Sequence, residues 1–322
     1  MLSLVLAHLL AGCAAPALVR RWGRDAFLLL AAVPALAFAW LLVEAVRLGP
    51  DGEVRQSLQW LPSLGLDLSF WLDPLSAVLA LLVTGVGALV VVFCSRYMPA
   101  GAPGNGRFAG VLLAFAGAML GLVLADSTML LYVFWELTTV FSYLLIGHSA
   151  HRKTSRRAAM QALIVTTAGG LAMLVGLVVL GETGSYRLSE LLADPPSGTA
   201  VDVAVVLVVL GALSKSALFP FHFWLPAAMA APTPVSAYLH AAAMVKAGVY
   251  LVARLAPGFA ETAPWRPTLV TLGLVTMLLG GWRALRQTDL KLVLAFGTVS
   301  QLGLLTVLAA WGTRDAALAA GE

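Results

Sequence analysis

Residues 203–226 read VAVVLVVLGALSKSALFPFHFWLP, and this stretch puts a lysine inside a long apolar segment. Its first half carries no charge, yet Lys215 follows directly and Pro220 comes shortly after it. The apolar segment as a whole, 202–229, would be about 42 Å long as a straight helix, which exceeds a simple membrane span. Because proline removes a backbone donor and clashes with the preceding turn, we expect this helix to break near Leu218–Phe221.

The composition of the whole chain is typical of a membrane protein. Of its 322 residues, 60% are hydrophobic and 11% are charged, whereas soluble domains carry about 25% charged residues. Because this number of charges is too small to cover a water-facing surface, most of the exterior must face a lipid bilayer. The net charge of +4 is not gathered into a cluster of Lys and Arg, so no nucleic-acid partner is predicted.

Ten apolar segments are long enough for transmembrane helices, which predicts an all-α, polytopic transmembrane helix bundle with a discontinuous seventh helix. They cover about 2–19, 26–48, 72–95, 108–125, 128–147, 158–181, 202–229, 234–256, 267–283 and 290–310. Asp73 and Pro74 are typical of an N-cap followed by proline at the first helical position, and Asp126 is expected to cap the fifth helix. We identify no alternation of polar and apolar residues that would predict a β-strand.

The loops, numbered in chain order, predict the orientation of the protein. Odd-numbered loops hold twelve of the twenty Lys and Arg residues, and even-numbered loops with the C-terminal tail hold six, among them Arg254 and Arg314. Acidic residues such as Asp51 lie mainly in the even-numbered loops. Because positively charged loops stay in the cytoplasm, we predict a multi-pass protein of the cell (plasma) membrane with its N-terminus outside.

Glu136 lies deep inside the predicted fifth helix, about 14 Å from the helix start and near the middle of a hydrocarbon core of about 30 Å. Tyr132 and Thr139 fall on the same helix face, so this polar stripe should point into protein or water. Intramembrane ionisable residues are usually functional. The alternative is a structural ion pair that only holds helices together.

Lys215 lies one turn before the expected break, between Ser214 and Ser216, with His222 just past the break. Transporters build ion sites at such discontinuous helices near the midplane of the membrane. The sequence therefore predicts a functional lysine here. The alternative is a proline kink with a lysine that reaches toward the interface.

Lys246 falls well inside the eighth predicted helix, and His240 lies at about half that depth among small residues that allow close helix contact. Lys291 opens the tenth helix, and Thr298 continues a polar face from it. His240 could equally be a hydrogen-bonded packing residue, and Lys291 could be an ordinary interfacial anchor.

Together these residues put one acid and two bases in three separate spans, with a histidine and hydroxyls nearby, which is typical of a proton or cation relay. We find no nucleotide-binding loop, no Gly-x-Ser-x-Gly motif and no Cys/His metal set. The sequence therefore predicts ion transport without a cofactor or a metal, and no enzyme.

Three stretches resemble the antiporter-like membrane subunits that respiratory complex I (NADH–quinone oxidoreductase) shares with Mrp-type multisubunit Na⁺/H⁺ antiporters. They read FWELTTVFSYLLIG (134–147), GALSKSALFPFHFWLPAAMAAPTPVSAYLHAAAMVKAGVYLVARL (211–255) and LRQTDLKLVLAFGTVSQLG (285–303). The resemblance covers most of the chain from Phe70 onward. TTAGGLAMLVG (166–176) looks most like the A-type subunit of the Mrp antiporter.

The resemblance implies roles for the charged residues. In this family, the glutamate of the fifth helix and the lysine before the break of the seventh form the pair that drives proton transfer, which puts these roles on Glu136 and Lys215. The later lysines belong to a hydrated relay, and their roles fall on Lys246 and Lys291. His240 matches a relay histidine of the family.

The family core has about fourteen helices, so the resemblance is to an N-terminal portion of it. It divides the chain into 1–69, a two-helix segment with an outer loop, and 70–322, an antiporter-like core that is incomplete at its C-terminus. It implies that other subunits, protons, and Na⁺ or another monovalent cation are partners.

The resemblance favours one of three functions and leaves the other two as alternatives. The first, which we predict, is an ion-translocating subunit of a multisubunit monovalent cation (Na⁺)/proton antiporter. The second is a proton-pumping subunit of complex I, similar to its large membrane subunit, or of a related membrane complex. The third is a scaffold subunit that transports nothing.

Overall fold

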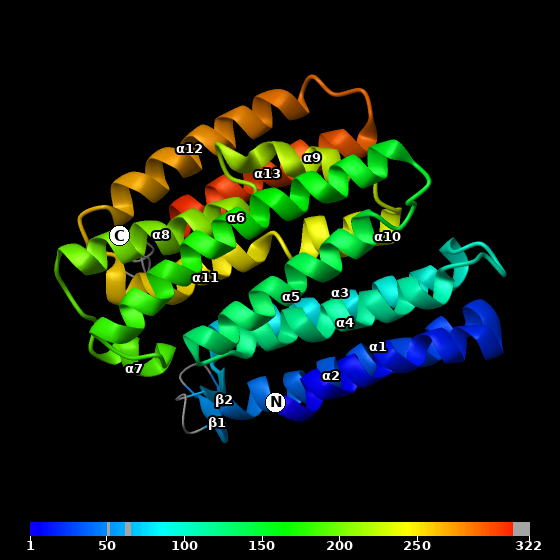
Figure 1. The fold of residues 1–322 in the computed structure, drawn as a ribbon, viewed down its shortest axis with the longest axis horizontal. Coiled ribbons are helices and arrows are strands. Elements are labelled where there is room, and N and C mark those ends of the chain that lie inside the picture. Colours follow the sequence, from blue (N-terminus) through cyan, green and yellow to red (C-terminus); the bar gives the residue numbers. More distant parts are fainter. Residues whose placement is uncertain (50–51, 62–65, 312–322) are drawn as a thin grey trace.

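The computed structural model describes residues 1–49, 52–61 and 66–311, which form a bundle of long helices with one small β-sheet (Figure 1). The long helices are α1 (Leu2–Trp22), α2 (Ala26–Leu48), α3 (Pro74–Tyr97), α4 (Asn105–Leu124), α5 (Thr128–Ile146), α6 (Lys153–Thr183), α8 (Thr199–Lys215), α11 (Lys246–Phe259), α12 (Trp265–Ala284) and α13 (Leu290–Ala309). Short helical elements are η1 (Gly23–Asp25), α7 (Leu188–Ala193), η3 (Phe221–Phe223), α9 (Trp224–Ala228), α10 (Thr233–Val235) and η4 (Ser236–Ala242), a π-helical turn.

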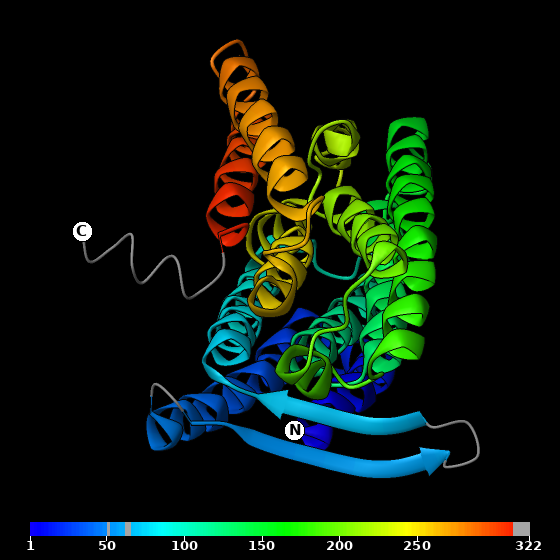
Figure 2. The same ribbon diagram turned by 90° about the vertical axis from the view of Figure 1, so that its left-hand side faces the viewer.

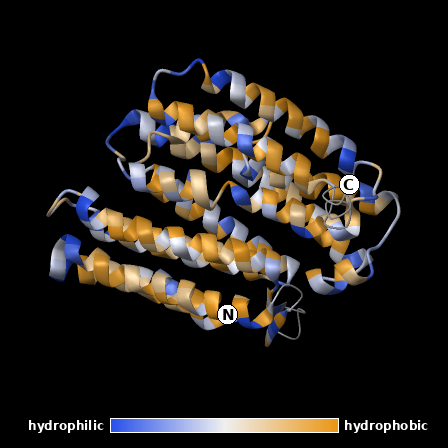
Figure 3. Ribbon diagram, turned by 180° about the vertical axis from the view of Figure 1, so that it is seen from behind, coloured by the Kyte–Doolittle hydropathy of each residue, from blue (hydrophilic) through white to orange (hydrophobic). Residues whose placement is uncertain are grey.

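The predicted polytopic helical fold is confirmed. Within the described residues, seven helical segments are long and apolar enough to cross a membrane, and the first of them contains both α1 and α2. Each of the ten predicted spans overlaps at least one helix of the structure. Hydrophobic residues cover most of the helix surfaces, and hydrophilic residues gather toward the helix ends and loops (Figure 3).

The prediction that the loops contain no strand is wrong. The strands β1 (Val54–Leu61) and β2 (Leu66–Leu72) pair antiparallel and lie at the same end of the bundle as α7 (Figures 1 and 2). The signal was present in the second strand, where Leu68, Phe70 and Leu72 alternate with more polar residues, as expected for a half-buried strand. In the first strand, Gln56 interrupts the alternation of apolar and polar residues, so the pattern there is weaker.

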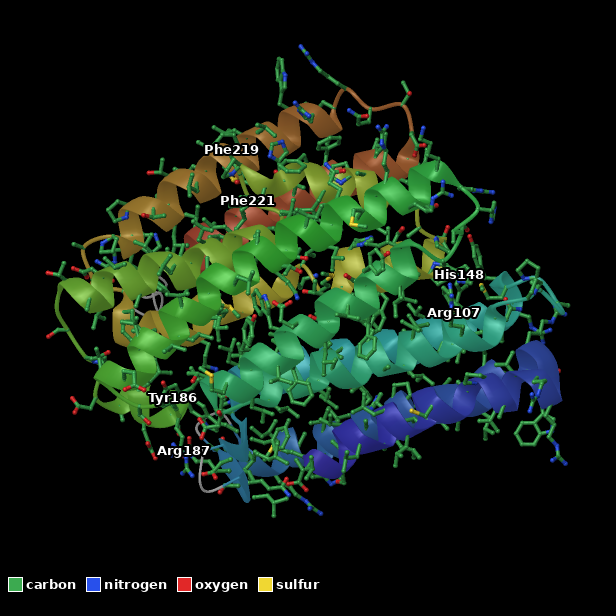
Figure 4. The ribbon with its side chains drawn as sticks, in the orientation of Figure 1. Arg107, His148, Tyr186, Arg187, Phe219 and Phe221 are labelled. Atoms are coloured by element: carbon green, nitrogen blue, oxygen red, sulfur yellow. The ribbon has the colours of Figure 1, made fainter. Side chains whose placement is uncertain are left out.

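The loops gather at two ends of the bundle. At one end, a hollow of about 600 Å³ is lined by residues of the third, fifth and seventh loops, among them Asn105, His148 and Met229. Figure 4 shows Arg107 and His148 at this end, and Tyr186 and Arg187 at the other. The described basic loops thus share one end. Which end faces the cytoplasm stays a prediction, and Asp51 and Arg314 lie outside the described residues.

Asp73 caps α3 as predicted. Its carboxylate accepts from the Ser76 backbone N–H at 3.0 Å, and the Ser76 Oγ accepts from the Asp73 N–H at 2.8 Å, with Pro74 at the first helical position. The predicted cap by Asp126 is wrong. Ser127 caps α5 instead, and Asp126 accepts from the backbone N–H of Ser189 at the start of α7.

Arg254 does not lie in a loop, as its position near the predicted end of a span suggested, but inside α11, where 4% of it is exposed. Its guanidinium donates to both carboxylate oxygens of Asp73 at 2.7 Å and stacks 4.4 Å from the ring centroid of Trp71. Burial raises the pKa of Asp73, but the hydrogen bonds and charge of Arg254 and the Ser76 contacts outweigh it and hold that pKa below its ordinary value. This ion pair ties α11 to β2 and α3.

We expect Arg254→Met to destabilise the protein by about 3 kcal/mol or more, because it leaves the Asp73 carboxylate largely buried without its partner. The double variant Arg254→Met/Asp73→Asn should recover part of this loss, since it removes the unpaired charge. Arg47→Met, which breaks an exposed pair with Glu44, is the control and should cost at most about 1 kcal/mol. Thermal unfolding of the purified protein in detergent measures all three, and equal effects of Arg254→Met and Arg47→Met would contradict the assignment.

Candidate functional site

The seventh predicted span is broken, as expected, but the break comes earlier than predicted. Helix α8 ends at Lys215, because Pro220 cannot donate to the carbonyl four residues before it and its ring would clash there. Ala217 adopts a left-handed backbone with φ of 50°. The Phe219 N–H donates to the Thr276 hydroxyl of α12 at 2.9 Å. Protein groups thus satisfy the freed backbone, as a break inside a membrane requires.

The eighth predicted span is also broken, which was not predicted from the sequence. The π-helical turn η4 ends at Ala242, and α11 begins only at Lys246. The Ser216 hydroxyl, just past the end of α8, donates to the Val245 carbonyl at 2.6 Å and accepts from the Val249 N–H at 3.2 Å. The two breaks therefore face each other, and each has a lysine at its helix end.

Lys215 is completely buried and is held by α5. Its ammonium donates to the Trp135 carbonyl and to the Thr139 hydroxyl, each at 2.7 Å, and lies 4.8 Å from the centroid of the Trp135 ring. The neighbouring Ser214 has a structural part. Its hydroxyl donates to the Gly211 carbonyl, and its own carbonyl accepts from the Trp224 indole at 2.9 Å.

Glu136 follows Trp135 directly on α5 and is half-buried, as is Tyr132 one turn earlier. Among the described residues, no direct ion pair joins Glu136 to Lys215. The indole and backbone of Trp135 contact the lysine instead. The Lys215 ammonium of α8 thus lies against the same turn of α5 that carries Glu136, and Trp135 of that turn contacts the lysine.

His240 and Lys291 line one hollow of about 130 Å³, together with Ser236, Ala241 and Thr298. His240 is 1% exposed, and neither of its ring nitrogens has a hydrogen-bond partner among the described residues. Lys291 also lines the larger hollow at the basic end of the bundle, where its ammonium donates to the Ala231 carbonyl at 3.0 Å. Lys291 therefore lies between that end and His240.

Lys246 is connected to the same hollow through one of its lining residues. Its ammonium donates to the carbonyl of Ala241, which lines the hollow. Lys246 also begins the helix that follows the Ser216–Val245 contact. Polar groups therefore follow one another from the basic end through Lys291, His240 and Lys246 to the two facing breaks and Lys215.

His222 lies apart from this series of residues. Its ring stacks on Phe219 with a centroid distance of 6.1 Å and meets the edge of Phe223. Phe219 is labelled in Figure 4, beside α12. No hydrogen bond or ion pair joins His222 to Lys215 or Glu136 in the part of the chain that the structure describes. Within that part, no three His, Cys, Asp or Glu side chains are grouped so that they could hold a metal ion.

Comparisons with known proteins identify the family of this chain. Residues 125–321 match the family model described as NADH:quinone oxidoreductase/Mrp antiporter, TM, and residues 60–109 match the N-terminus of chain 5 of NADH–ubiquinone oxidoreductase (complex I). The chain is similar to the A-type subunit of the Na⁺/H⁺ antiporter of Alkalihalophilus pseudofirmus, with 45% identity over 90% of this chain. It is 48% identical over 84% of its length to the A/B-type subunit of a probable K⁺/H⁺ antiporter of Rhizobium meliloti.

The fold is similar to a chain of the Mrp complex from Dietzia sp., with a TM-score of 0.90 and 40% identity over 98% of this chain. The chain spans 36% and 27% of the lengths of the two relatives and 35% of that solved chain. The family model matches more than half of the chain, including the turn of α5 with Glu136 and both facing breaks. The chain belongs to the NADH:quinone oxidoreductase/Mrp antiporter family.

Proposed function

We propose that this chain is an ion-translocating membrane subunit of a multisubunit monovalent cation/proton antiporter. It moves protons through Glu136, Lys215, Lys246, His240 and Lys291. One observation carries the proposal: Lys215 is fully buried, and its ammonium is held by a carbonyl and a hydroxyl with no direct carboxylate partner among the described residues. A lysine that serves only as structural support would be paired, because an unpaired buried charge is costly. Lysine can shed its proton when buried, which suits a relay.

The hollows support an entry for protons at the basic end of the bundle. Lys291 lines both hollows, and His240 lines the inner one. The larger hollow has a mainly polar lining, so water there can bridge groups that do not touch. The inner hollow has mainly apolar walls, in which Lys291 and His240 are polar exceptions. The relay then runs from Lys291 past His240 and Lys246, and across the two facing breaks to Lys215 and the turn of α5.

The relatives favour an antiporter over a complex I subunit. The two relatives at 45% and 48% identity are named subunits of Na⁺/H⁺ and K⁺/H⁺ antiporters. We therefore propose Na⁺ or another monovalent cation as the exchanged ion and other antiporter subunits as partners. A proton-pumping subunit of complex I is the second candidate, because the family model covers both kinds of complex.

Thr138 and Thr139 offer a matched test of how α5 holds Lys215. Both are fully buried and both donate to the Trp135 carbonyl, but only Thr139 accepts from Lys215. Thr139→Val should lower cation/proton exchange about tenfold, because a hydrogen bond to a charged group contributes about 1.5–3 kcal/mol. Thr138→Val should leave exchange nearly unchanged. Exchange in inverted vesicles measures both, and equal rates for the two variants would contradict this role.

Glu136→Gln keeps the size of the side chain and removes its titratable proton. We expect the variant to assemble with its partner subunits and to lose cation/proton exchange, because the relay needs a group that takes up and releases a proton. Co-purification of partner subunits measures assembly, and vesicle assays measure exchange. Normal exchange by an assembled Glu136→Gln complex would exclude the relay.

The orientation remains a proposal that rests on the basic loops at one end of the bundle. We propose that this end faces the cytoplasm and that the N-terminus lies outside, in the cell membrane. In a Cys13→Ser background, a cysteine at the exposed Thr154 should react with an impermeant label only from the cytoplasmic side, and one at the exposed Ser197 only from outside. The opposite pattern would reverse the orientation.

A further inference from the structure

Two buried polar atoms on α5 have no hydrogen-bond partner among the described residues. They are the indole nitrogen Nε1 of Trp135 and the carboxylate oxygen Oε1 of Glu136. Buried polar groups in proteins nearly always have a partner, either in the protein or in ordered water. The indole N–H can only donate, and an ionised carboxylate can only accept. The two atoms therefore need complementary partners.

Both atoms lie against the same residue of α6. A Cβ added to Gly170 would lie 3.5 Å from Trp135 Nε1 and closer still to Glu136 Oε1. Both atoms thus pack near the Gly170 backbone. Gly170 is buried, and its lack of a side chain lets the carboxylate approach the backbone of α6.

The remaining parts of Trp135 contact Lys215. The Trp135 carbonyl accepts from the ammonium at 2.7 Å, and the ring centroid lies 4.8 Å from it. Trp135 therefore contacts the base through its ring and backbone, and its indole N–H lies beside the acid.

We infer that Trp135, Glu136 and Gly170 form one water-binding position, in which Trp135 and Gly170 position a water molecule on the Glu136 carboxylate. The indole N–H donates to the water oxygen, and the water donates to Oε1 of the ionised Glu136. When Glu136 is protonated, the same water accepts from its O–H. Because the indole cannot accept, it fixes which way the water points. The inference rests on the proposed proton relay and adds two positioning residues to it.

Trp135→Phe tests the donor in the assembled complex. It keeps an aromatic ring and the backbone carbonyl beside Lys215, and it removes the N–H together with part of the indole ring. The control Trp265→Phe loses the same ring volume. We expect a loss of exchange of about tenfold with assembly unchanged. We also expect a shift of the infrared carbonyl band of protonated Glu136, a band identified by its disappearance in Glu136→Gln. A residue that only packs against its neighbours would not shift this band.

Trp265→Phe is the matched control for the donor. Trp265 is also buried, and its indole N–H donates to the Ala310 carbonyl at 3.1 Å, between α12 and the end of α13. This control should leave the Glu136 band in place. An unchanged band in Trp135→Phe overturns the inference, whatever its rate of exchange.

Gly170→Ala tests the space for the carboxylate that the water binds. The added methyl group should lower exchange at least tenfold, because it pushes the carboxylate from its position. Gly170→Ala/Glu136→Asp should recover several-fold over Gly170→Ala, since the shorter acid leaves room for the methyl group. Gly281→Ala is the control, because its Cβ would meet only the Ser300 hydroxyl at 3.5 Å. A double variant that is assembled but no more active than Gly170→Ala overturns the inference.

These results separate the inference from the proposed function. If assembled Glu136→Gln exchanges normally, the relay itself is wrong. If Glu136→Gln is inactive but Trp135→Phe keeps both the normal rate and the normal carbonyl band, the relay stands and only the water position is wrong.

Discussion

The burial of the Lys215 ammonium is the constraint on which the middle of this bundle depends. A buried ammonium needs polar partners, and α5 supplies two oxygens, from Trp135 and Thr139. The end of α8 at Lys215 also frees backbone groups, and α12 supplies the Thr276 hydroxyl for one of them. The packing of α5 and α12 around α8 therefore depends on the charge of Lys215 and on the break caused by Pro220. The Ser216 hydroxyl, just past the end of α8, then joins this break to the second one, because it donates to the Val245 carbonyl and accepts from the Val249 N–H.

Much of this arrangement follows from local chemistry and could be predicted. Pro220 predicts a break wherever it stands, since the missing N–H and the ring clash belong to the residue itself. The cap by Asp73 follows from sequence spacing in the same way, and Lys215 and His240 are buried in the structure. The break between η4 and α11 could not be predicted, because no proline lies between Ser236 and Val245. It is stabilised by contacts from distant elements, such as the Tyr238 hydroxyl donating to the Val83 carbonyl of α3.

In the candidate site too, some features follow from the sequence and others depend on contacts between distant elements. Spacing along a helix indicates that Thr139 shares a face with Glu136, but it cannot indicate that the lysine binds the threonine and the Trp135 carbonyl instead of the glutamate. That choice depends on how α8 packs on α5. The prediction that Arg254 lies in a loop is wrong for a related reason. Its place near the end of an apolar segment is compatible with a loop, and only the neighbouring Asp73 and Trp71 explain why it is buried.

Arg254 and Lys215 show two ways of burying a basic side chain in one protein. Arg254 has both of its terminal nitrogens on the two oxygens of Asp73, and a guanidinium keeps its charge at any accessible pH. This pair is complete, and nothing in it needs to change. Lys215 has two neutral oxygen partners, the Trp135 carbonyl and the Thr139 hydroxyl. The half-buried acid Glu136 directly follows Trp135 on α5. A carbonyl and a hydroxyl can bind an ammonium and can also tolerate a neutral amine, because neither carries a charge that would be left unpaired. The residue types and their partners thus distinguish a permanent ion pair near the end of the bundle from a buried lysine in its middle, and only the lysine has the neutral partners that the proposed relay requires.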